Sequence, residues 1–553
     1  MAASKVPSGL KAAAAMDDAA AVKTMAKGRW APAVQFFFLA LSVVAMCALL
    51  YAPRLSSAPA PYGAVAGFFA PKLTSTSTAS SPVQLGPEHV ATAAAATGDD
   101  ADRVDGAGAL PLHVRLDNQV GSPCASLPDH GICCDRTDYH SDVCFMSGDV
   151  RTDAASLSLL LFPPPGASAA PAAAEPERIR PYTRKWDGYI TKTIHEVTLR
   201  AARPEESAAA AAGHHRCDVR HDAPAFVVTA GGYSHNMFHV FNDGFLPLWL
   251  TSQHLRRRVV LAVLAYTPRW AGTYGEIISA LSGYRAVDLL RDSRTHCFPG
   301  AIVGTRYHDY LAVNSTRLQD NKTVVDFHRF LAGAYHDDDP KDGGDISKPA
   351  TATATATPAP ERRPRLGIVS RKGRRVIENQ AAVAALASSV GFDVDIMETG
   401  TGTPLSATYG TVSSYDALVG VHGADLTAFL FLRPGRAALA QIAPLGITLL
   451  SRNLFGVPAA RMGLEYEQYD VTAGESSLSR RYPAGHVVVA DPARARREQG
   501  AKEWDLVEHV YLRGQNVSID LGRFRETLAR MYSRWKERQQ SQVVSGADAL
   551  PRV

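Results

Sequence analysis

The sequence predicts an α/β protein with two Rossmann-like domains facing a cleft, preceded by a single transmembrane helix and a flexible stem. Two domains are predicted because strand-like and helix-like segments alternate on both sides of a low-complexity stretch at 336–361, as is typical of doubly wound sheets. A chain of 553 residues has room for two such domains and for non-globular segments. Its 46% hydrophobic and 20% charged residues are typical of a globular protein, and the net charge of +4 does not indicate a nucleic-acid partner.

The predicted transmembrane helix is an uncharged apolar run near the N-terminus. No charged residue occurs from Trp30 to Pro53, and about 20 apolar residues suffice for a helix to cross a bilayer. Five Lys and Arg residues precede the run, whereas only Arg54 follows it closely. The positive-inside rule therefore predicts a cytosolic tail at 1–29, a signal anchor at 30–53 and a luminal remainder. A cleaved signal peptide is the alternative, although the run is long for one.

Composition divides the luminal part into segments. Ala, Ser, Thr, Pro and Gly dominate 54–115 and predict a flexible stem. The segments expected after it are an N-terminal domain at 116–335, a linker at 336–361, a C-terminal domain at 362–500 and a helical segment at 501–553 that packs back onto the body. Two shorter Ala-rich stretches, 163–176 and 206–213, are expected to be loop insertions in the first domain.

The cysteines and sequons agree with a luminal location. Six cysteines lie outside the apolar run, four of them between 124 and 144, and their even number is compatible with disulfides whose connectivity the sequence leaves open. A zinc site is the alternative, but the chain has no C-x-x-C pair. N-x-S/T sequons make Asn314, Asn321 and Asn516 candidate glycosylation sites.

The elements expected in the two halves alternate along the chain. Strands are expected at 225–230 and 259–265 in the first half and at 365–370, 392–397, 417–421 and 437–442 in the second; helices are expected at 236–250, 275–281 and 379–390. A D-x-D match at 393–395 is interpreted as a solvated strand face rather than a metal site. Ligands of such folds bind at the carboxyl ends of strands, which points to the segments after Ala230, Ser370 and Val421.

The segment after Ser370 belongs to the densest basic cluster of the chain. Arg371, Lys372, Arg374 and Arg375 follow the expected strand, and three more arginines lie at its start. Basic groups at a strand end before a helix can bind a diphosphate through charge-assisted hydrogen bonds. A solvated basic face is the alternative.

The segment after Val421 reads His422-Gly423-Ala424-Asp425. Small residues at a strand-to-helix turn allow a ligand to approach the backbone closely, and the N-terminus of the following helix favours phosphate. His422 can equally be a buried histidine bonded to the backbone. Neither a G-x-G-x-x-G fingerprint nor a P-loop occurs here.

The segment after Ala230 gathers candidate acid–base residues beside two glycines. They are His235, Asn236, His239, Asn242 and Asp243. A carboxylate and histidines at a Gly-rich turn suit general-base work on a hydroxyl, and we predict Asp243 as the base, with His239 as the competing candidate. Zinc is disfavoured because Asn236 stands where the H-E-x-x-H motif has Glu. Ordinary helix packing with a capping Asp is the alternative.

Several segments together resemble plant glycosyltransferase family 61. They are IRPYTRKWD (179–187), GGYSHNMFHVFNDGFLPLW (231–249), THCF and IVGTRYH (295–308), RPRLGIVSRKGRR (363–375), DALVGVHGADLT (416–427), LRPG (432–435), QIAPLG (441–446), and ESSL and RRYP (475–483). Their order and spacing cover nearly the whole luminal body. The two most specific elements are the SRKG-x-R segment and the strand followed by HGA and LT.

The resemblance implies a GT-B fold and an inverting transfer of a pentose from a UDP-sugar to a glycan acceptor, with no obligatory metal or other cofactor. It also implies a single-pass type II protein of the Golgi membrane, with a Golgi glycosyltransferase complex as a further expected partner. In grasses, members of this family decorate xylan with arabinofuranosyl or xylosyl side chains, and others xylosylate N-glycans. The implied acceptor side includes His235, Asn236 and Asn242. The implied donor site comprises Arg371, Lys372, Arg375, the backbone at His422 and Gly423, and Glu475 and Ser476.

The sequence departs from the family pattern in both domains. The departures are His235, Val240, Glu378, Ala382, Asp425 and Ala428. Asp425 replaces the second glycine of H-G-A-G-L-T-N and places a negative charge near the expected diphosphate. These changes motivate an alternative, a non-catalytic Golgi glycan-binding or scaffold protein, which would not bind UDP. A hydrolase of wall polysaccharide is the second alternative, but it needs two carboxylates across a cleft, and Asp243 has no evident partner.

Overall fold

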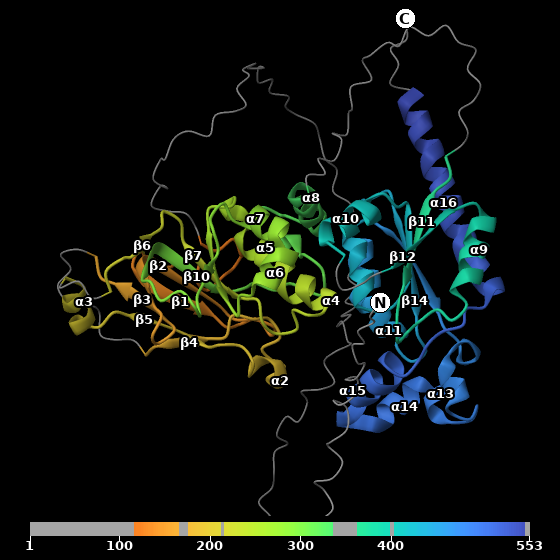
Figure 1. Cartoon of the computed structure of the whole chain (residues 1–553), viewed down its shortest axis with the longest axis horizontal. Coiled ribbons are helices and arrows are strands. Elements are labelled where there is room, and N and C mark those ends of the chain that lie inside the picture. The colour runs from red at the N-terminus through yellow and green to blue at the C-terminus, as the bar shows by residue number, and fades with distance from the viewer. Residues whose placement is uncertain (1–115, 165–174, 212–214, 336–361, 399–402, 548–553) are drawn as a thin grey trace, which may run out of the picture. The chain divides into compact units, whose positions relative to one another are not determined.

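The computed structural model describes residues 116–164, 175–211, 215–335, 362–398 and 403–547 (Figure 1). These residues belong to one compact unit that spans Ala95–Val553. The expected membrane anchor, stem and linker lie outside the described residues. No helix within the described ranges has the length and apolar character needed to cross a bilayer.

Ten strands of the first half form one mixed sheet (Figure 1). The order is β4-β5-β3-β2-β10-β7-β8-β9, with β1 beside β2 and β6 beside β10. The strands are β1 (Gly131–Asp135), β2 (Val143–Asp153), β3 (Ser158–Phe162), β4 (Glu177–Ile179), β5 (Val197–Ala201), β6 (Val219–Arg220), β7 (Ala225–Thr229), β8 (Val260–Leu264), β9 (Val287–Asp288) and β10 (His296–Gly304). The neighbours β10, β7, β8 and β9 are parallel, whereas β2 runs antiparallel to β1, β3 and β10.

The two strands expected in this half are confirmed as β7 and β8. A purely doubly wound sheet was expected here, and that expectation is wrong, because β1 to β4 add an antiparallel part. Strand β2 pairs with most of β10, although the two lie far apart along the chain. Pairing at such a distance is set by the tertiary structure and leaves little local signal in the sequence.

The six described cysteines form three disulfides. Cys124–Cys133 ties the chain before β1 to β1, Cys134–Cys144 joins β1 to β2, and Cys217–Cys297 joins the chain before β6 to β10. The connectivity that the sequence left open is thereby assigned, and these cysteines are not available as zinc ligands.

Short helices connect and cover the strands of this half. They are α2 (Gly188–Thr191), α3 (Pro204–Ala211), α4 (Met237–His239), the π-helix η2 (Val240–Phe245), α5 (Leu246–Ser252), η3 (Gln253–Leu255), α6 (Pro268–Thr273), α7 (Gly275–Leu281), η4 (Ser315–Arg317) and α8 (Val324–Ala334). The helix expected at 275–281 is confirmed as α7. The helix expected at 236–250 is divided into α4, η2 and α5.

The Ala-rich stretch at 206–213 was expected to be a loop, and this is wrong for its described part, which belongs to α3. Alanine has the highest helix propensity of all residues, and Pro204 occupies the first turn, where proline is tolerated. Glu206 in the same turn accepts two hydrogen bonds of 2.7 Å from the Arg200 guanidinium. These contacts hold the start of the helix against β5.

Five parallel strands of the second half form a separate sheet in the order β12-β11-β13-β14-β15. They are β11 (Arg365–Ser370), β12 (Asp393–Glu398), β13 (Ala417–Val421), β14 (Ala438–Ala443) and β15 (Glu465–Asp470). The four strands expected here are confirmed, and the doubly wound prediction holds for this half. Strand β15 was missed because its sequence, EYEQYD, is polar and lies at the sheet edge.

Helices cover both faces of this second sheet (Figure 1). On one face, α9 (Gln380–Val390) packs against α16 (Leu521–Ala547), so that the C-terminal segment returns to the body as expected. The other elements are α10 (Leu405–Ser413), η5 (Ala424–Phe431), α11 (Thr448–Ser451), the π-helix η6 (Arg452–Gly456), α12 (Val457–Arg461), η7 (Ala473–Glu475), η8 (Ser477–Arg480), α13 (Val487–Ala490), α14 (Pro492–Gln499), η9 (Gly500–Lys502), α15 (Glu503–Leu506) and the π-helix η10 (Val507–Leu512).

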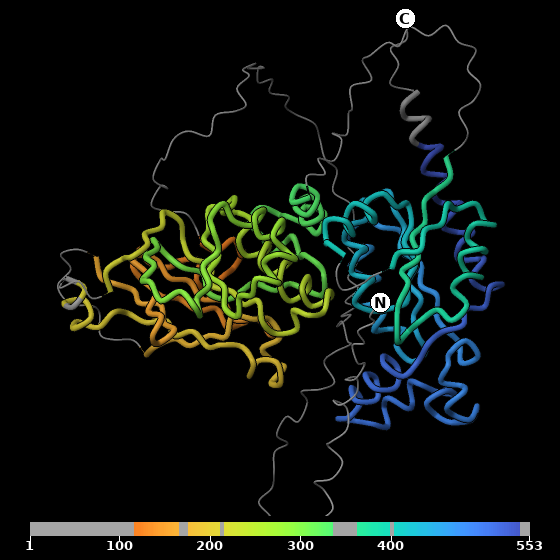
Figure 2. The backbone as a smooth tube through the Cα atoms, in the orientation of Figure 1, coloured from red at the N-terminus to blue at the C-terminus, as the bar shows by residue number. Residues whose placement is uncertain are grey.

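One apolar core runs from the first half into the second. Figure 2 traces the two halves in separate colour ranges, orange to green for the first and cyan to blue for the second. Phe238 packs against Phe455 with ring centroids 5.6 Å apart, and Phe241 packs against Phe431 at 5.8 Å. The His328 Nδ1–H donates to the Leu430 carbonyl at 3.0 Å. These contacts join the helices after β7 and helix α8 of the first half to η5 and η6 of the second.

Candidate active site

The turn after β7 leads into a distorted helix. Gly232 adopts a φ of +68°, and a Cβ there would lie 2.6 Å from the Tyr182 ring, so only glycine fits. The Asn236 side chain caps α4 by accepting from the Phe238 amide at 3.0 Å. The helix then widens into the π-helix Val240–Phe245, and π-helical turns occur frequently at functional sites.

His239 and Asp243 form a hydrogen-bonded pair in this distorted helix. The Asp243 carboxylate contacts His239 Nδ1 at 2.5 Å, and its second oxygen accepts from the Asn242 amide at 2.7 Å. Asn242 is fixed in turn because its Oδ1 accepts from the Leu311 amide at 2.9 Å. The Asp243 side chain is 1% exposed and that of His239 is 19% exposed.

This geometry gives the two candidate bases different roles. Both oxygens of Asp243 already accept hydrogen bonds, and burial separates them from any substrate in solution. A neutral His239 that donates Nδ1–H to Asp243 presents Nε2 as an acceptor. The structure therefore favours His239, the competing candidate from the sequence, for contact with a hydroxyl, with Asp243 holding its ring.

The three expected acceptor-side residues are not equivalent. Asn236 caps a helix and Asn242 supports Asp243, whereas His235 is exposed beside the Tyr233 ring, with centroids 6.4 Å apart. Within the described residues, no group of three or more His, Cys, Asp or Glu side chains is arranged to hold a metal ion.

The second group of candidates lies at the carboxyl ends of β11 and β13. These neighbouring parallel strands carry helices on opposite faces of the sheet, and such a switch point in an open sheet is where ligands bind. Arg371 follows β11, and its guanidinium forms a 2.7 Å ion pair with Asp425, which follows β13. A Cβ on Gly423 would lie 2.6 Å from Arg371 Nη1. The missing side chain at 423 therefore makes room for the guanidinium.

Arg375 is a half-buried cation beside this pair. Its amide donates to the Gln515 carbonyl at 2.9 Å, while its Nε is buried and has no hydrogen-bond partner within the described residues. Burial, together with the positive charges of Arg371 and Arg374, lowers the pKa of Arg375 to about 10. A buried and incompletely paired guanidinium is costly, and an anion bound here would offset that cost.

His422 is a buried and neutral imidazole at the same point. Burial holds its pKa well below the usual range, and Arg375 and Arg371 add to this effect. The Gln441 amide lies 2.9 Å from His422 Nδ1, and Gln441 Oε1 accepts from the Tyr466 hydroxyl at 2.7 Å. Gln441 was not predicted, although it is the one polar residue in the apolar strand ALAQIA.

The basic cluster is divided between the two ends of β11. Lys372 is largely exposed and pairs with Glu398 at 3.1 Å. Arg362 pairs with Asp416 at 2.6 Å, and Arg363 donates to backbone carbonyls at the end of α9. Only Arg371 and Arg375 are thus built into the switch point.

Glu475 and Ser476 are held by structural contacts. Glu475 forms a capping box with Thr472 and also accepts from the Tyr469 hydroxyl and the Arg523 guanidinium. The Ser476 hydroxyl donates to the Gln515 side chain at 2.7 Å. Gln515 therefore links Ser476 to Arg375 through hydrogen bonds. Both carboxylate oxygens of Glu475 already accept hydrogen bonds from the protein.

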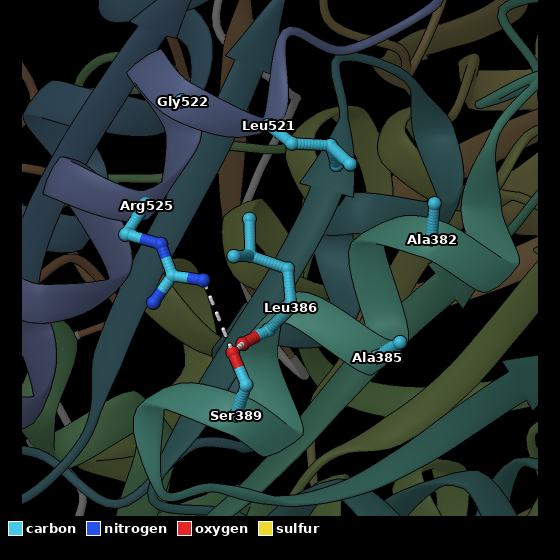
Figure 3. A pocket seen from close by; sticks show the side chains of 7 residues that line it. All are labelled: Ala382, Ala385, Leu386, Ser389, Leu521, Gly522 and Arg525. Atoms are coloured by element: carbon cyan, nitrogen blue, oxygen red, sulfur yellow. Dashed lines mark hydrogen bonds between the residues drawn. The ribbon is translucent and has the colours of Figure 1, made fainter.

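The departures from the family pattern fall in different environments. Ala428 is fully buried in the core, and Glu378 pairs with Arg480 at 2.5 Å. Ala382 lines a hollow between α9 and α16 (Figure 3), where Arg525 donates to Ser389 Oγ at 3.4 Å. That hollow contains none of the expected catalytic or donor residues, so Asp425 is the departure that meets the candidate donor site.

The two groups of candidates adjoin through the core. Helix α4, which carries His239, packs against η5, which follows Gly423. The Phe455 ring lies 5.6 Å from Phe238 and 5.2 Å from His422. The candidate base and the candidate anion site are thus neighbours.

The three sequons differ in accessibility. Asn314 and Asn321 are exposed. Asn516 is partly buried, and its Oδ1 accepts from the Val376 amide at 3.1 Å. The side-chain positions therefore favour glycan attachment at Asn314 and Asn321 over Asn516.

Comparison with known proteins identifies the class. The family model described as Glycosyltransferase 61 matches residues 233–439. The chain is 35% identical to the xylan glycosyltransferase MUCI21 of Arabidopsis thaliana, over 76% of this chain and 82% of that protein. It is 35% identical to the beta-1,2-xylosyltransferase XYXT1 of Oryza sativa subsp. japonica, over 73% and 84%, and 33% identical to the alpha-1,3-arabinosyltransferase XAT3 of the same plant, over 71% and 64%.

The chain therefore belongs to glycosyltransferase family 61, as its sequence motifs predicted. The matched residues include both the His239–Asp243 pair and the Arg371–Asp425 pair. A solved structure of the heptosyltransferase TibC shares 13% identity over 64% of this chain and 84% of that chain, with a TM-score of 0.23.

Proposed function

We propose that this protein transfers a pentose, arabinofuranose or xylose, from a UDP-sugar to xylan with inversion at the anomeric carbon. The names of its relatives support a xylan acceptor and a pentose donor. We further infer that the two sheets correspond to the two halves of a GT-B fold, with the donor bound by the second half.

The observation that carries the proposal is the incompletely paired Arg375 guanidinium beside neutral His422 at the switch point of the second sheet. A nucleoside diphosphate is the anion that a glycosyltransferase must hold there. Arg375 and the His422 imidazole would donate to its oxygens. Charge develops on these oxygens as the sugar leaves, so fixed donors stabilise the transition state more than the ground state.

His239 is the proposed general base. An acceptor hydroxyl attacks the anomeric carbon, its proton passes to His239 Nε2, and the bond from that carbon to the diphosphate oxygen breaks to release UDP. Asp243 keeps the proton of the neutral ring on Nδ1 and stabilises the imidazolium that forms. The Arg375 cation and a hydrogen bond from His422 would stabilise the diphosphate, and we propose that no metal is required.

We also propose a Golgi location with one N-terminal membrane anchor. Disulfides persist in the secretory pathway and are rare in the cytosol, and the described cysteines form three of them. The uncharged run from Trp30 to Pro53 supports the anchor. Membership of a Golgi glycosyltransferase complex stays a prediction.

A specific observation favours a second candidate, a non-catalytic glycan-binding or scaffold protein. Asp425 already neutralises Arg371, a cation expected to face the donor. An N-glycan xylosyltransferase is a further alternative, since it would need the same donor site and differs in its acceptor.

The test is transfer by the purified full-length chain in detergent. UDP-arabinofuranose, UDP-xylose and UDP-N-acetylglucosamine are offered in turn with xylohexaose, with and without EDTA. Product from one pentose donor that persists in EDTA is the expected result. No product together with no UDP binding would favour the scaffold. UDP binding without product would direct the assay to an N-glycan acceptor.

A further inference from the structure

We propose that aromatic rings beside His239 form an acceptor platform, Tyr139, Trp186, Tyr189 and Tyr233, which binds the sugar faces of a neutral pyranose chain such as xylan. The inference rests on the proposed function and adds the residues that hold its acceptor. Trp186 and Tyr233 lie in segments that carry the family motifs, and Tyr189 lies two residues beyond one of these segments. None of the four residues is used in the donor site.

A continuous series of contacts joins Tyr233, Trp186 and Tyr139 of the platform to the candidate base. The Tyr233 ring lies 4.7 Å from the His239 ring. The Arg184 guanidinium lies over Tyr233 at 5.6 Å and over Trp186 at 4.5 Å. Tyr139 is nearly parallel to Trp186, with an interplanar angle of 10° and centroids 6.2 Å apart. A ligand lying along these rings would therefore end at His239.

The inner part of the platform is rigid and carries no unpaired charge. The Tyr233 hydroxyl donates to Asp187 at 3.2 Å, and Arg184 pairs with the same carboxylate at 3.6 Å. Burial raises the pKa of Tyr233, Asp187 adds to the rise, and Tyr189 is near enough to contribute, so the phenol stays neutral. Because Arg184 and Asp187 neutralise each other, this part of the platform fits a neutral ligand better than an anion.

The outer part of the platform is unusually exposed. Tyr139 is 58% exposed and Tyr189 is 78% exposed. Large aromatic side chains in water contribute little to folding, and when they gather beside a functional site they mark a binding surface. A pyranose presents apolar C–H faces to such rings and hydroxyls at its edges, and covering the rings removes apolar area from water.

A uridine ring could also stack on these aromatics, but the cations that suit its diphosphate lie on the second sheet, at Arg371 and Arg375. The platform lies on the first half, next to the base that must meet the acceptor. The arrangement therefore favours the glycan over the nucleotide.

The test compares Tyr139→Ala and Tyr189→Ala with Tyr139→Phe, which keeps the ring, in the full-length chain. Trp504→Ala is the matched control, because Trp504 is 57% exposed and lies in the C-terminal segment. Xylohexaose binding is measured by calorimetry without donor, UDP binding is measured separately, and KM and kcat are measured for transfer. We expect both Ala variants to raise the Kd and KM for xylohexaose about five- to tenfold. Tyr139→Phe should raise them less than Tyr139→Ala because it keeps the ring, whereas Trp504→Ala and UDP binding should be unchanged.

The binding measurement separates this inference from the proposed function. If the wild-type chain binds xylohexaose but transfers nothing, loss of binding in the Ala variants still supports the platform. Unchanged xylohexaose affinity in both Ala variants, or no binding by the wild-type chain, would overturn it. A parallel loss of UDP affinity would assign the rings to the nucleotide instead.

Discussion

Asp425 pairs with Arg371 across the switch point of the second sheet, and the two side chains meet at 2.7 Å in the space left open by Gly423. Only 11% of the Arg371 side chain is exposed. The family pattern that this sequence resembles has glycine in place of Asp425. The cation expected to face a diphosphate thus already has an anion, and a donor must compete with it or share it.

Replacing Asp425 with Gly is expected to strengthen UDP binding. Arg371 would lose its internal partner and become available to the diphosphate, which we expect to lower the Kd for UDP about tenfold. Calorimetry with UDP measures the change. Asp425→Glu keeps the charge and serves as the control, with affinity close to that of the wild type. Weaker binding by Asp425→Gly would mean instead that Asp425 orients Arg371 for the donor.

Gly423→Ala is expected to weaken UDP binding. The new methyl group would lie 2.6 Å from Arg371 Nη1 and displace the guanidinium. Overpacking of this kind lowers the free energy of unfolding by about 1–3 kcal/mol. Gly410→Ala is the matched control, because nothing lies within 4 Å of a Cβ there and the residue belongs to α10. That substitution should leave UDP affinity unchanged. Equal affinity in both variants would remove Arg371 from the donor site.

Substitutions in the His239–Asp243 pair should separate chemistry from donor binding. His239→Gln removes the base, and we expect kcat to fall about 10²- to 10⁴-fold with UDP affinity retained. Asp243→Asn should also reduce kcat strongly, because a neutral Asn amide cannot stabilise the His239 imidazolium as the Asp243 carboxylate does. Single-turnover transfer and UDP calorimetry measure the two effects. Full turnover by His239→Gln, with loss only in Asp243→Asn, would restore Asp243 as the base.

The sequence predicted the local features of the site better than its long-range contacts. The strands before Arg371 and His422 are apolar runs bounded by turns, so their ends were located closely. The pairing of Arg371 with Asp425 was not predictable, because it depends on which strands become neighbours. The contacts around Asp243 were not predictable for the same reason: Asn242, which donates to Asp243, is itself held by the amide of Leu311, which lies far along the chain. The antiparallel strands β1 to β4 likewise depend on pairing with distant segments.

Arg306 is expected to be a main anchor of the first half. It is buried and binds the carboxylates of Asp117 and Asp135 and the Ser122 hydroxyl. Arg306→Met would leave two buried carboxylates without their cation, and we expect a loss of about 3–5 kcal/mol in the free energy of unfolding. Chemical denaturation measures it. Arg291→Met, at an exposed pair with Asp288, is the control and should cost at most about 1 kcal/mol.

The Arg306–Asp135 pair predicts that the protein loses stability at low pH. Burial acts to raise the pKa of Asp135, but hydrogen bonds from Thr137 and Arg306 outweigh it and leave the pKa below the usual value. A carboxyl whose folded pKa is lowered stabilises the protein above its unfolded pKa of about 4 and loses that contribution as the pH falls further. The melting temperature should therefore drop between about pH 4 and pH 2. Asp135→Asn removes the titrating group, so its melting temperature should be lower at pH 7 and should fall less over that range. An identical pH dependence in this variant would assign the acid limit to other carboxyls.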